Sequence, residues 1–416
     1  MKVRITPFTP SGNITAPPSK SEAMRYILLA ALADGKTVIK NVGDSSDVKA
    51  ATGCVKSLGA KVDYDGRDVT VYGIKTPPKA AAFDFGECGF LLRTIIPTAH
   101  VLGVKFSFST SGKLALRPIR PLIDALSESL VKTESGEYYG KASAGEFVID
   151  GSESSQFISG LLIAAAAMKG VSRIKIVGEK VSDGYTELTL AALENFGVKT
   201  EKNGDTVIVY GGNVVSPDTL VCGGDYSSAA YFLALGAIKG SVTVKGLDEN
   251  SKQPDRAIID ILRGYGADVA IRGDEITVRA AKQKKPIDRS VKNCPDLAQT
   301  MAALAANADG ESVIRDVGRL KYKESDRVEA ILTTLATAGI KGELIGENLH
   351  IFGGKTLGGE FKGEKDHRTV MSQAILAATA DGDSVINGAE AVKKSFPSFF
   401  ENLEKVGGFN DVRILR

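Results

Sequence analysis

The chain has 416 residues, of which 43% are hydrophobic, so it is long enough to form two domains that each bury a core. It carries 52 basic and 50 acidic residues, a formal net charge of +2, and no tryptophan. This balance provides no global basic field and argues against a nucleic-acid-binding protein. Any affinity for anions must therefore come from local clusters of cations.

The sequence gives no sign of a membrane, metal or disulfide protein. Its longest apolar run, around Leu161 to Met168, falls far below the roughly 18 residues that span a bilayer, and the N-terminus lacks the hydrophobic segment of a signal peptide. The 4 cysteines lie far apart without a C-x-x-C pair, and only 3 histidines are present. We expect a cytoplasmic protein with no membrane contact and no bound metal.

Residues 1–8 are predicted to form a strand, and a repeated pattern follows it. The pattern is an apolar helix, a glycine, a β-branched strand, a loop, a second helix that ends near glycine, and another strand. In chain order it covers residues 28–72, 91–149 (degenerate), 161–210, 232–278, 302–352 and 374–407 (shortened). The second helix ends where glycine can adopt positive φ, at Gly59, Gly197, Gly266 and Gly339.

One such repeat cannot bury its apolar helix alone, so the copies must assemble around shared centres. Three copies in each domain would place buried helices inside and sheets outside, in a two-domain α/β fold. We expect one domain over residues 15–223 and a discontinuous second domain over residues 1–14 plus 224–416. The chain would cross between them near residues 15–18, stiffened by Pro17-Pro18, and near 223–225, loosened by Gly223-Gly224, which suits a hinge.

The most informative motifs are Lys323-Glu324-Ser325-Asp326-Arg327 and Asp366-His367-Arg368. Arginine suits bidentate capture of carboxylate or phosphate, and a glutamate kept among cations can carry protons. The two clusters together predict a site for an anionic substrate with acid-base chemistry. The alternative is a solvated helix face on which Lys323 and Arg327 are neighbours at i, i+4.

Other polar motifs precede apolar helices. Pro18-Ser19-Lys20-Ser21, with Arg25, opens an apolar helix over residues 26–32; Ser21 could cap that helix, while its N-terminus and the two cations attract an anion. Ordinary capping with incidental cations is the alternative. Gly151-Ser152-Glu153-Ser154-Ser155-Gln156 opens another helix in the same way and would suit phosphate or a polyol.

Three further positions fit the same pattern. Arg117 precedes Pro118, which places it in an extended loop, and Gly89 lies in a glycine turn that allows close backbone approach to a ligand. Asp296 begins the apolar helix over residues 297–306, either as a helix cap or as a buried general base. Each motif alone is compatible with a simple turn or cap. Because the loop before an apolar helix repeatedly receives such groups, a common site is favoured.

In this order the motifs resemble those of the 5-enolpyruvylshikimate-3-phosphate synthases, the enolpyruvyl transferases of the shikimate pathway. The similarity covers essentially the whole chain. It includes Pro18-Ser19-Lys20-Ser21, Arg117-Pro118-Ile119, Ser154-Ser155-Gln156, Ser182 with Tyr185, Asp296, the two charged clusters, and Lys394-Ser395-Phe396-Pro397. The resemblance implies an inside-out α/β barrel in each of two domains, built from three βαβαββ units and hinged around an interdomain cleft.

The resemblance also implies the reaction. The enolpyruvyl group of phosphoenolpyruvate would be transferred to the 5-hydroxyl of shikimate 3-phosphate by addition and elimination of phosphate, in chorismate and aromatic amino acid biosynthesis. No metal or organic cofactor is required. The implied partners are these two small molecules alone, the chain is expected to be a monomer, and glyphosate would compete with phosphoenolpyruvate.

Site residues follow from the same resemblance. Shikimate 3-phosphate would be bound by Lys20, Ser21, Arg25, Ser154, Ser155, Gln156, Ser182, Tyr185, Asp296, Arg319 and Lys323. Phosphoenolpyruvate would be bound by Lys20, Gly89, Arg117, Gln156, Glu324, Arg327, Arg368 and Lys394. The catalytic groups would be Asp296, as the base toward the 5-hydroxyl, Glu324, as the proton carrier to the enol methylene, and Lys20.

The chain departs from the family pattern in places, and alternatives stay open. Glu87-Cys88-Gly89-Phe90 stands where the family commonly has Asn-Ala-Gly-Thr, and Arg319 stands where some relatives have Asn. The sister transferase, which acts on UDP-N-acetylglucosamine, usually has a reactive cysteine five residues before the Arg-Pro, where this chain has Gly112. A non-catalytic repeat scaffold would have no need for interleaved arginines and carboxylates.

Overall fold

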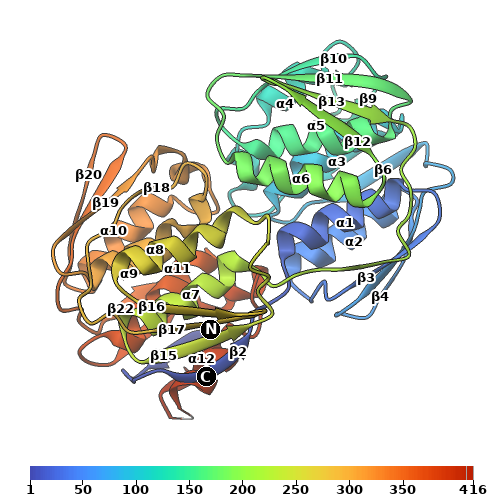
Figure 1. The fold of residues 1–416 in the computed structure, drawn as a ribbon. Helices are drawn as coiled ribbons and strands as arrows, with labels where there is room; N and C mark the ends of the chain where they lie inside the picture. Colours follow the sequence, from blue (N-terminus) through green and yellow to red (C-terminus); the bar gives the residue numbers. More distant parts are fainter. Residues whose placement is uncertain (409, 416) are drawn as a thin grey trace. The chain divides into compact units, whose positions relative to one another are not determined.

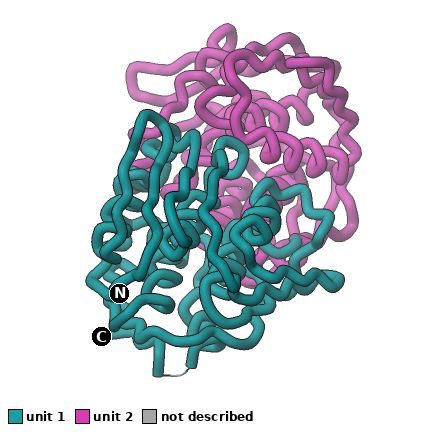
Figure 2. Tube along the Cα trace, turned by 60° about the vertical axis from the view of Figure 1, so that its left-hand side comes forward, with its two compact units in different colours: residues 1–17, 223–416 teal, residues 18–222 magenta. Residues whose placement is uncertain are grey.

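The computed structural model describes residues 1–408 and 410–415. The chain divides into two compact units (Figure 2). The inserted unit is Pro18–Cys222, and the terminal unit combines Met1–Pro17 with Gly223–Arg416. The chain thus passes from one unit to the other between Pro17 and Pro18 and again between Cys222 and Gly223.

The inserted unit contains six α-helices and three four-stranded sheets (Figure 1). The helices are α1 (Lys20–Leu32), α2 (Ser46–Ser57), α3 (Gly89–Val101), α4 (Arg120–Leu126), α5 (Ser155–Ala167) and α6 (Asp183–Asn195), with the 3₁₀ helix η1 (Leu114–Leu116). The strands are β3 (Lys36–Lys40), β4 (Lys61–Tyr64), β5 (Val69–Tyr72), β6 (Ala80–Asp84), β7 (Lys105–Ser109), β8 (Val131–Lys132), β9 (Tyr138–Tyr139), β10 (Glu146–Asp150), β11 (Gly170–Val177), β12 (Lys199–Asn203), β13 (Thr206–Gly211) and β14 (Thr219–Val221).

The described part of the terminal unit has the same make-up. Its helices are α7 (Tyr226–Ile238), α8 (Ile258–Tyr265), α9 (Ala298–Ala306), α10 (Arg327–Thr337), α11 (His367–Thr379) and α12 (Phe399–Gly407), with the 3₁₀ helices η2 (Pro254–Ala257), η3 (Pro295–Leu297), η4 (Gly318–Tyr322) and η5 (Ala389–Lys394). The strands are β1 (Lys2–Ile5), β2 (Ser11–Thr15), β15 (Ser241–Lys245), β16 (Asp268–Arg272), β17 (Glu275–Arg279), β18 (Asp288–Ser290), β19 (Glu311–Arg315), β20 (Lys341–Ile345), β21 (Asn348–Phe352), β22 (Glu360–Lys362), β23 (Ser384–Asn387) and β24 (Val412–Leu415).

All six sheets share one topology, which confirms the repeat seen in the sequence. Each contains one parallel pair, such as β6 with β7, and two antiparallel pairs. The glycines predicted to end the second helix of a repeat have positive φ, at 101° for Gly59, 70° for Gly197, 103° for Gly266 and 73° for Gly339. Glycine is favoured there because a side chain in this conformation is strained.

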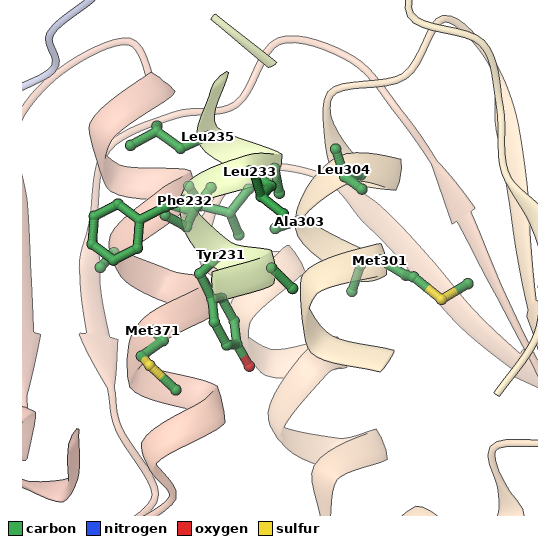
Figure 3. Packing of buried hydrophobic residues seen from close by; sticks show 14 of the residues in the cluster. Tyr231, Phe232, Leu233, Leu235, Met301, Ala303, Leu304 and Met371 are labelled. Atoms are coloured by element: carbon green, nitrogen blue, oxygen red, sulfur yellow. The ribbon is translucent and has the colours of Figure 1, made fainter. Parts of the chain in front are cut away.

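The helices that were predicted to be buried form the centre of each unit. In the terminal unit α7, α9 and α11 pack against one another, and every residue of α7 is buried (Figure 3). In the inserted unit α3 packs against α5, and every residue of α3 is buried. A helix that is apolar on all sides has no face suited to water, so it is stable only inside such a core.

The terminal unit is discontinuous because strands near the N-terminus pair with strands from the C-terminal part of the chain. Strand β2 pairs in parallel with β15, with Ile14 opposite Val244, and β1 lies between β23 and β24. The N-terminal segment therefore completes two sheets of the terminal unit. In the inserted unit β14 completes the first sheet by pairing with β3.

Some element boundaries differ from the sequence prediction. The strand predicted over residues 1–8 is limited to Lys2–Ile5, and the helix predicted over residues 26–32 begins at Lys20. The helix predicted from residue 297 begins one residue later, after the short η3. Among the described residues, no helix combines the length and the apolar character that crossing a membrane requires.

Candidate active site

The predicted site residues form two groups, one in each unit. In the inserted unit most of them lie at the start of four helices, while Arg117 directly follows η1 and Arg25 lies within α1. Gly89 and Ser155 are the first residues of α3 and α5, Ser182 directly precedes α6, and Lys20 begins α1. The first N–H groups of a helix have no partner within it and carry partial positive charge, so these positions suit anionic groups.

Ser19, and not Ser21, caps α1, which corrects the sequence prediction. The Ser19 hydroxyl accepts a hydrogen bond from the backbone N–H of Glu22 at 3.4 Å. A cap must lie outside the helical conformation, and Ser19 is extended at φ −66° and ψ 101°, whereas Ser21 already lies inside the first turn. The Ser21 hydroxyl is therefore not needed for capping.

Arg25 connects α1 to α5 and α6. It is 2% exposed, and it donates to the backbone oxygens of Ser21 at 2.8 Å and Tyr185 at 3.1 Å. It also donates to the hydroxyl of Thr189 at 2.9 Å, and its guanidinium lies 4.6 Å from the centre of the Phe90 ring. Burial lowers the pKa of Arg25 to about 10, which still leaves it charged at neutral pH. The structure thus brings three of the predicted acceptor residues together.

Lys20 pairs with a carboxylate that the sequence prediction did not include. Its Nζ lies 2.8 Å from Oδ2 of Asp47, which is at the start of α2. Both side chains are largely buried, so Asp47 fixes the direction of the lysine. An Asp in the first turn of a second helix has no local signature that would have marked it as a partner of Lys20.

A second arginine cluster lies at the start of α3. Arg93 donates to the Gln156 side chain at 2.8 Å, to the backbone oxygen of Gly89 at 3.2 Å and to that of Pro118 at 2.9 Å. A Cβ added at Gly89 would lie 2.6 Å from the nearest nitrogen of Arg117 and 2.7 Å from that of Arg93. Only glycine fits here without displacing a guanidinium. Arg93 was not predicted as a site residue, although its spacing of four from Gly89 on a helix places both on one face.

The remaining acceptor residues lie at α5 and α6. The Ser154 hydroxyl caps α5 by accepting from the backbone N–H of Gln156 at 3.3 Å. Ser182 has left-handed φ and ψ of 56° and 40°, which is unusual for a residue with a side chain. Such strain persists where the surroundings require it and is frequent at ligand sites.

The terminal unit centres on Arg327. This arginine is 1% exposed and binds three carboxylates, each through a different nitrogen. Its partners are Asp366 at 2.9 Å, Asp296 at 2.9 Å and Glu324 at 2.8 Å. The two carboxylates that were predicted to transfer protons are therefore held by the same guanidinium.

Arg368 and Lys394 complete this ion cluster. Arg368 donates to Oδ2 of Asp296 at 2.7 Å, and Lys394 lies 3.4 Å from Oε1 of Glu324. Asp366, which is completely buried, caps α11 by accepting from the backbone N–H of Arg368 at 2.9 Å. The sequence places Asp366 in one of the two charged clusters but does not indicate its role.

The cations of the cluster determine the charge of its carboxylates. Burial alone would raise the pKa of Asp296, but the charges of Arg368, Arg327 and Lys323 together hold that pKa well below the usual range. Asp366 behaves similarly, since burial opposes ionisation and Arg327 outweighs it, so its pKa is lowered. Both carboxylates are ionised at neutral pH.

Two further predicted residues lie nearby in sequence, and one prediction is corrected. Arg319 donates to the backbone oxygen of Lys292 at 2.6 Å, and Lys323 ends the 3₁₀ helix η4. Asp296 lies within η3 and does not cap α9, whose first N–H groups receive no side-chain cap. The interpretation of Asp296 as a simple helix cap is therefore wrong, because its oxygens bind arginines.

The cysteines and the possible metal ligands were the remaining candidates for a chemical role. None of the four cysteines forms a disulfide, all four are buried, and burial raises the pKa of the Cys294 thiol to about 12. Among residues 1–408 and 410–415, no group of three or more His, Cys, Asp or Glu side chains could hold a metal ion.

Comparison with solved structures defines the fold class. The EPSP synthase of Acinetobacter baumannii matches with a TM-score of 0.83 over 100% of both chains, at 23% sequence identity. At that identity the likeness shows the fold alone. The chain has the two-domain α/β architecture of that enzyme, with helices inside the sheets.

Comparison of sequences identifies the family. The family model described as EPSP synthase (3-phosphoshikimate 1-carboxyvinyltransferase) matches residues 7–403. The 3-phosphoshikimate 1-carboxyvinyltransferase of Pyrococcus abyssi is 39% identical over 405 residues, which are 95% of each chain. That of Methanopyrus kandleri is 36% identical over 411 residues, covering 95% of this chain and 96% of the relative. The chain belongs to the EPSP synthase family of enzymes.

Proposed function

We propose that this chain transfers the enolpyruvyl group of phosphoenolpyruvate to the 5-hydroxyl of shikimate 3-phosphate and releases phosphate. The observation that carries the residue-level proposal is that Arg327 binds both Asp296 and Glu324. The reaction needs one proton removed from a hydroxyl and another delivered to carbon. Two carboxylates held rigidly by one buried cation suit these two roles.

The acceptor groups are assigned mainly to the inserted unit. Ser21, Ser154, Ser155, Gln156, Ser182 and Tyr185 would bind shikimate 3-phosphate, together with Arg25, Lys20, Asp296, Arg319 and Lys323. Support comes from the helix N-termini and from Arg25, whose bonds to the backbones of Ser21 and Tyr185 hold α1 and α6 in register. A phosphate at such N-termini gains from the backbone N–H groups as well as from the cations.

Phosphoenolpyruvate would be bound by cations of both units. The assigned residues are Lys20, Gly89, Arg117, Gln156, Glu324, Arg327, Arg368 and Lys394. The missing side chain at Gly89 lets the ligand approach the guanidinium of Arg117. Two substrates that each bring a phosphate and a carboxylate repel one another, and converging cations offset this repulsion.

The cluster around Arg327 also suggests how the base becomes active. Asp296 with a strongly lowered pKa is a weak proton acceptor. When phosphoenolpyruvate binds Arg327 and Arg368, its negative charge offsets theirs, and the pKa of Asp296 rises toward its ordinary range. The base would thus gain strength only when the substrate is present.

The chemical steps then balance. In the addition, Asp296 takes the hydroxyl proton, the oxygen forms a bond to C2 of phosphoenolpyruvate, and Glu324, which must enter this step protonated, delivers its proton to the methylene carbon. In the elimination, a proton returns from that carbon to Glu324, the C2–O bond to phosphate breaks, and phosphate leaves. Lys20, aligned by Asp47, would offset the charge on the departing phosphate.

We also propose that the two crossings near Pro17–Pro18 and Cys222–Gly223 act as a hinge, because the assigned groups of both units must act on the same atoms. Small-angle scattering should show a smaller radius of gyration when shikimate 3-phosphate binds. An unchanged radius, with binding measured separately, would contradict the hinge. The chain would act as a monomer in the cytoplasm.

The test of the function is phosphate release from phosphoenolpyruvate with each of two acceptors. We expect release with shikimate 3-phosphate and none with UDP-N-acetylglucosamine. In the structure Gly112 has a positive φ of 57°, and the Glu87 carboxylate lies where its Cβ would stand, so a cysteine at this position would be strained and would displace Glu87. Equal turnover of the two acceptors would refute the assignment.

A further inference from the structure

A further aspartate of the terminal unit lies buried close to the ion cluster. Asp255 belongs to the 3₁₀ helix η2 and is 1% exposed. The Ser227 hydroxyl on α7 donates a hydrogen bond to Oδ2 of Asp255. The neighbouring Gln253 ties η2 to the start of α7, because its side chain accepts from the backbone N–H of Tyr226 at 2.9 Å and donates to the backbone oxygen of Gly224 at 2.8 Å. Asp255 therefore has a fixed position.

The charged groups that face Asp255 come from several elements. The carboxylate of Asp296 and the guanidinium of Arg368 both act on it, and so does Asp225, which precedes α7. The Cys294 thiol also faces Asp255, and its raised pKa leaves it neutral. Asp255 and Asp296 thus share the field of one guanidinium, that of Arg368.

The α7 helix contributes a second polar group toward Arg368. Tyr231 lies four residues after Ser227, so the two side chains project from the same face of α7. Figure 3 shows the Tyr231 ring leaving the helix with its hydroxyl oxygen at the far end. The charges of Arg368 and Arg327 act on this hydroxyl, although burial dominates and raises the Tyr231 pKa to about 12.

We propose that Asp255 is a positioning residue whose proton controls the positive charge that Arg368 presents to phosphoenolpyruvate. The inference rests on the proposed function, in which Arg368 binds that substrate. With a proton on Asp255, the charge of Arg368 is available to Asp296 and to the incoming anion. With Asp255 ionised, a second buried carboxylate offsets that charge, and anion binding weakens.

Neutral pH lies in the range in which Asp255 would change state. Burial and, after it, the charges of Asp296 and Asp225 raise its pKa, Arg368 and the Ser227 hydrogen bond act in the opposite direction, and the net result is a pKa of about 7. As the pH rises through this range, Asp255 loses its proton and the affinity for phosphoenolpyruvate falls. The effect belongs to KM more than to kcat, because Asp255 touches no reacting atom in the proposal.

The test compares wild type with Asp255→Asn between pH 6 and pH 8. The amide keeps the shape and the acceptor for Ser227 but cannot ionise, and both proteins experience the same titration of the substrate phosphate. We expect kcat/KM for phosphoenolpyruvate, as the ratio of variant to wild type, to rise by about threefold to tenfold over this range. A merely structural role would change the ratio equally at every pH.

A second variant supplies an independent check. Ser227→Ala removes a hydrogen bond that favours the ionised carboxylate, so it should move the wild-type inflection upward by roughly half to one pH unit. Thermal unfolding of both variants identifies any loss that reflects folding alone. A ratio that does not vary with pH, or an inflection that stays in place in Ser227→Ala, would overturn the role of Asp255.

The same comparison is made for phosphoenolpyruvate binding by calorimetry, with and without shikimate 3-phosphate. If wild type binds phosphoenolpyruvate but releases no phosphate, the proposed function fails while Asp255 is still tested. If turnover is normal and binding of phosphoenolpyruvate to wild type and Asp255→Asn changes in parallel with pH, the function stands and the inference about Asp255 fails.

Discussion

The two units hold their buried arginines in different ways. In the inserted unit Arg25 and Arg93 donate to backbone, hydroxyl and amide oxygens, and each lies over a phenylalanine ring. In the terminal unit Arg327 and Arg368 donate to carboxylates. The partners are neutral in the first case and charged in the second.

The difference matters for what each unit can do. Neutral acceptors orient a guanidinium without cancelling its charge, so the inserted unit keeps a positive field for phosphate and carboxylate groups. Carboxylate partners cancel the charge until a substrate anion replaces them. In the proposed mechanism, the terminal unit therefore holds Asp296, the assigned base, as a carboxylate of low proton affinity until the substrate binds. This contrast suggests that the inserted unit mainly binds and that the terminal unit mainly reacts.

The largest effect is expected at Asp296. Asp296→Asn keeps the shape but cannot accept the hydroxyl proton, so kcat should fall by roughly 100-fold to 10,000-fold, the usual contribution of a general acid or base. Calorimetry should show that shikimate 3-phosphate still binds. Asp326→Asn is the matched control, since Asp326 caps α10 and Asn is an equally good cap. Activity of the Asp296 variant within about threefold of wild type would remove the base from the mechanism.

The next prediction compares matched substitutions of a buried arginine in each unit. Arg327→Met leaves three buried carboxylates without their cation and should cost about 3–5 kcal/mol of unfolding free energy. Arg93→Met removes the donor from the neutral oxygens of Gly89, Pro118 and Gln156 and should cost about 1–3 kcal/mol. Urea unfolding followed by circular dichroism measures both. Equal losses would show that the charge of the partners does not distinguish the units.

Lowering the pH should also destabilise the inserted unit before it destabilises the terminal unit. Burial lowers the pKa of His100 in α3 to about 4, below the unfolded value of about 6.5, so its contribution to stability is lost as the pH falls from about 6.5 toward 4. Asp255 in the terminal unit has a raised pKa, so protonation stabilises that unit over much of the same range. The lowered pKa values of Asp296 and Asp366 cost the terminal unit stability only below about pH 4.

Hydrogen exchange, measured by mass spectrometry on peptides from each unit, tests which unit loses stability first as the pH falls. Between pH 7 and pH 4, peptides of the inserted unit should lose roughly 1–2 kcal/mol of protection relative to those of the terminal unit. His100→Gln should reduce the difference, because a neutral amide can keep the contact with Ser129. If both units lose protection together and only below pH 4, protonation of His100 does not destabilise the inserted unit.

Much of the fold could be read from local signals in the sequence. Apolar helices, β-branched strands and glycines such as Gly59 and Gly266 repeat because every copy must satisfy the same backbone geometry. The first and last residues of the helices and strands could be predicted less accurately. Ser19 and Ser21 are equally good caps by residue type, and the choice between them depends on where the chain enters α1. The pairing of β2 with β15 and of β14 with β3 has no local signal, because each pair joins strands that lie far apart in the sequence.

The site residues, like the fold, could be predicted where the signal was local and could not be predicted where it depended on distant contacts. The motifs marked Arg327, Asp296 and Lys20 because charged residues were concentrated before helices. The partners Asp47, Asp366 and Arg93 were missed as site residues, since their role depends on contacts across 27, 39 and 63 positions of the chain. Tertiary structure, not residue type, decides which of several carboxylates meets a given cation.

The smallest expected effect concerns Gly89 and glyphosate, which in this family competes with phosphoenolpyruvate. In Gly89→Ala the new methyl would lie 2.6 Å from Arg117 and 2.7 Å from Arg93, so the guanidinium ends must shift. Contacts this short require both guanidinium ends to move by more than a few tenths of an ångström, which the flexible ends of arginine side chains can do. Because glyphosate is longer than the substrate, its inhibition constant should rise about tenfold and the KM for phosphoenolpyruvate only about threefold. Gly53→Ala is the control, since a methyl there meets no atom within 4 Å. Equal increases in both constants, or a wild type that glyphosate does not inhibit, would show that Gly89 does not limit the length of the ligand.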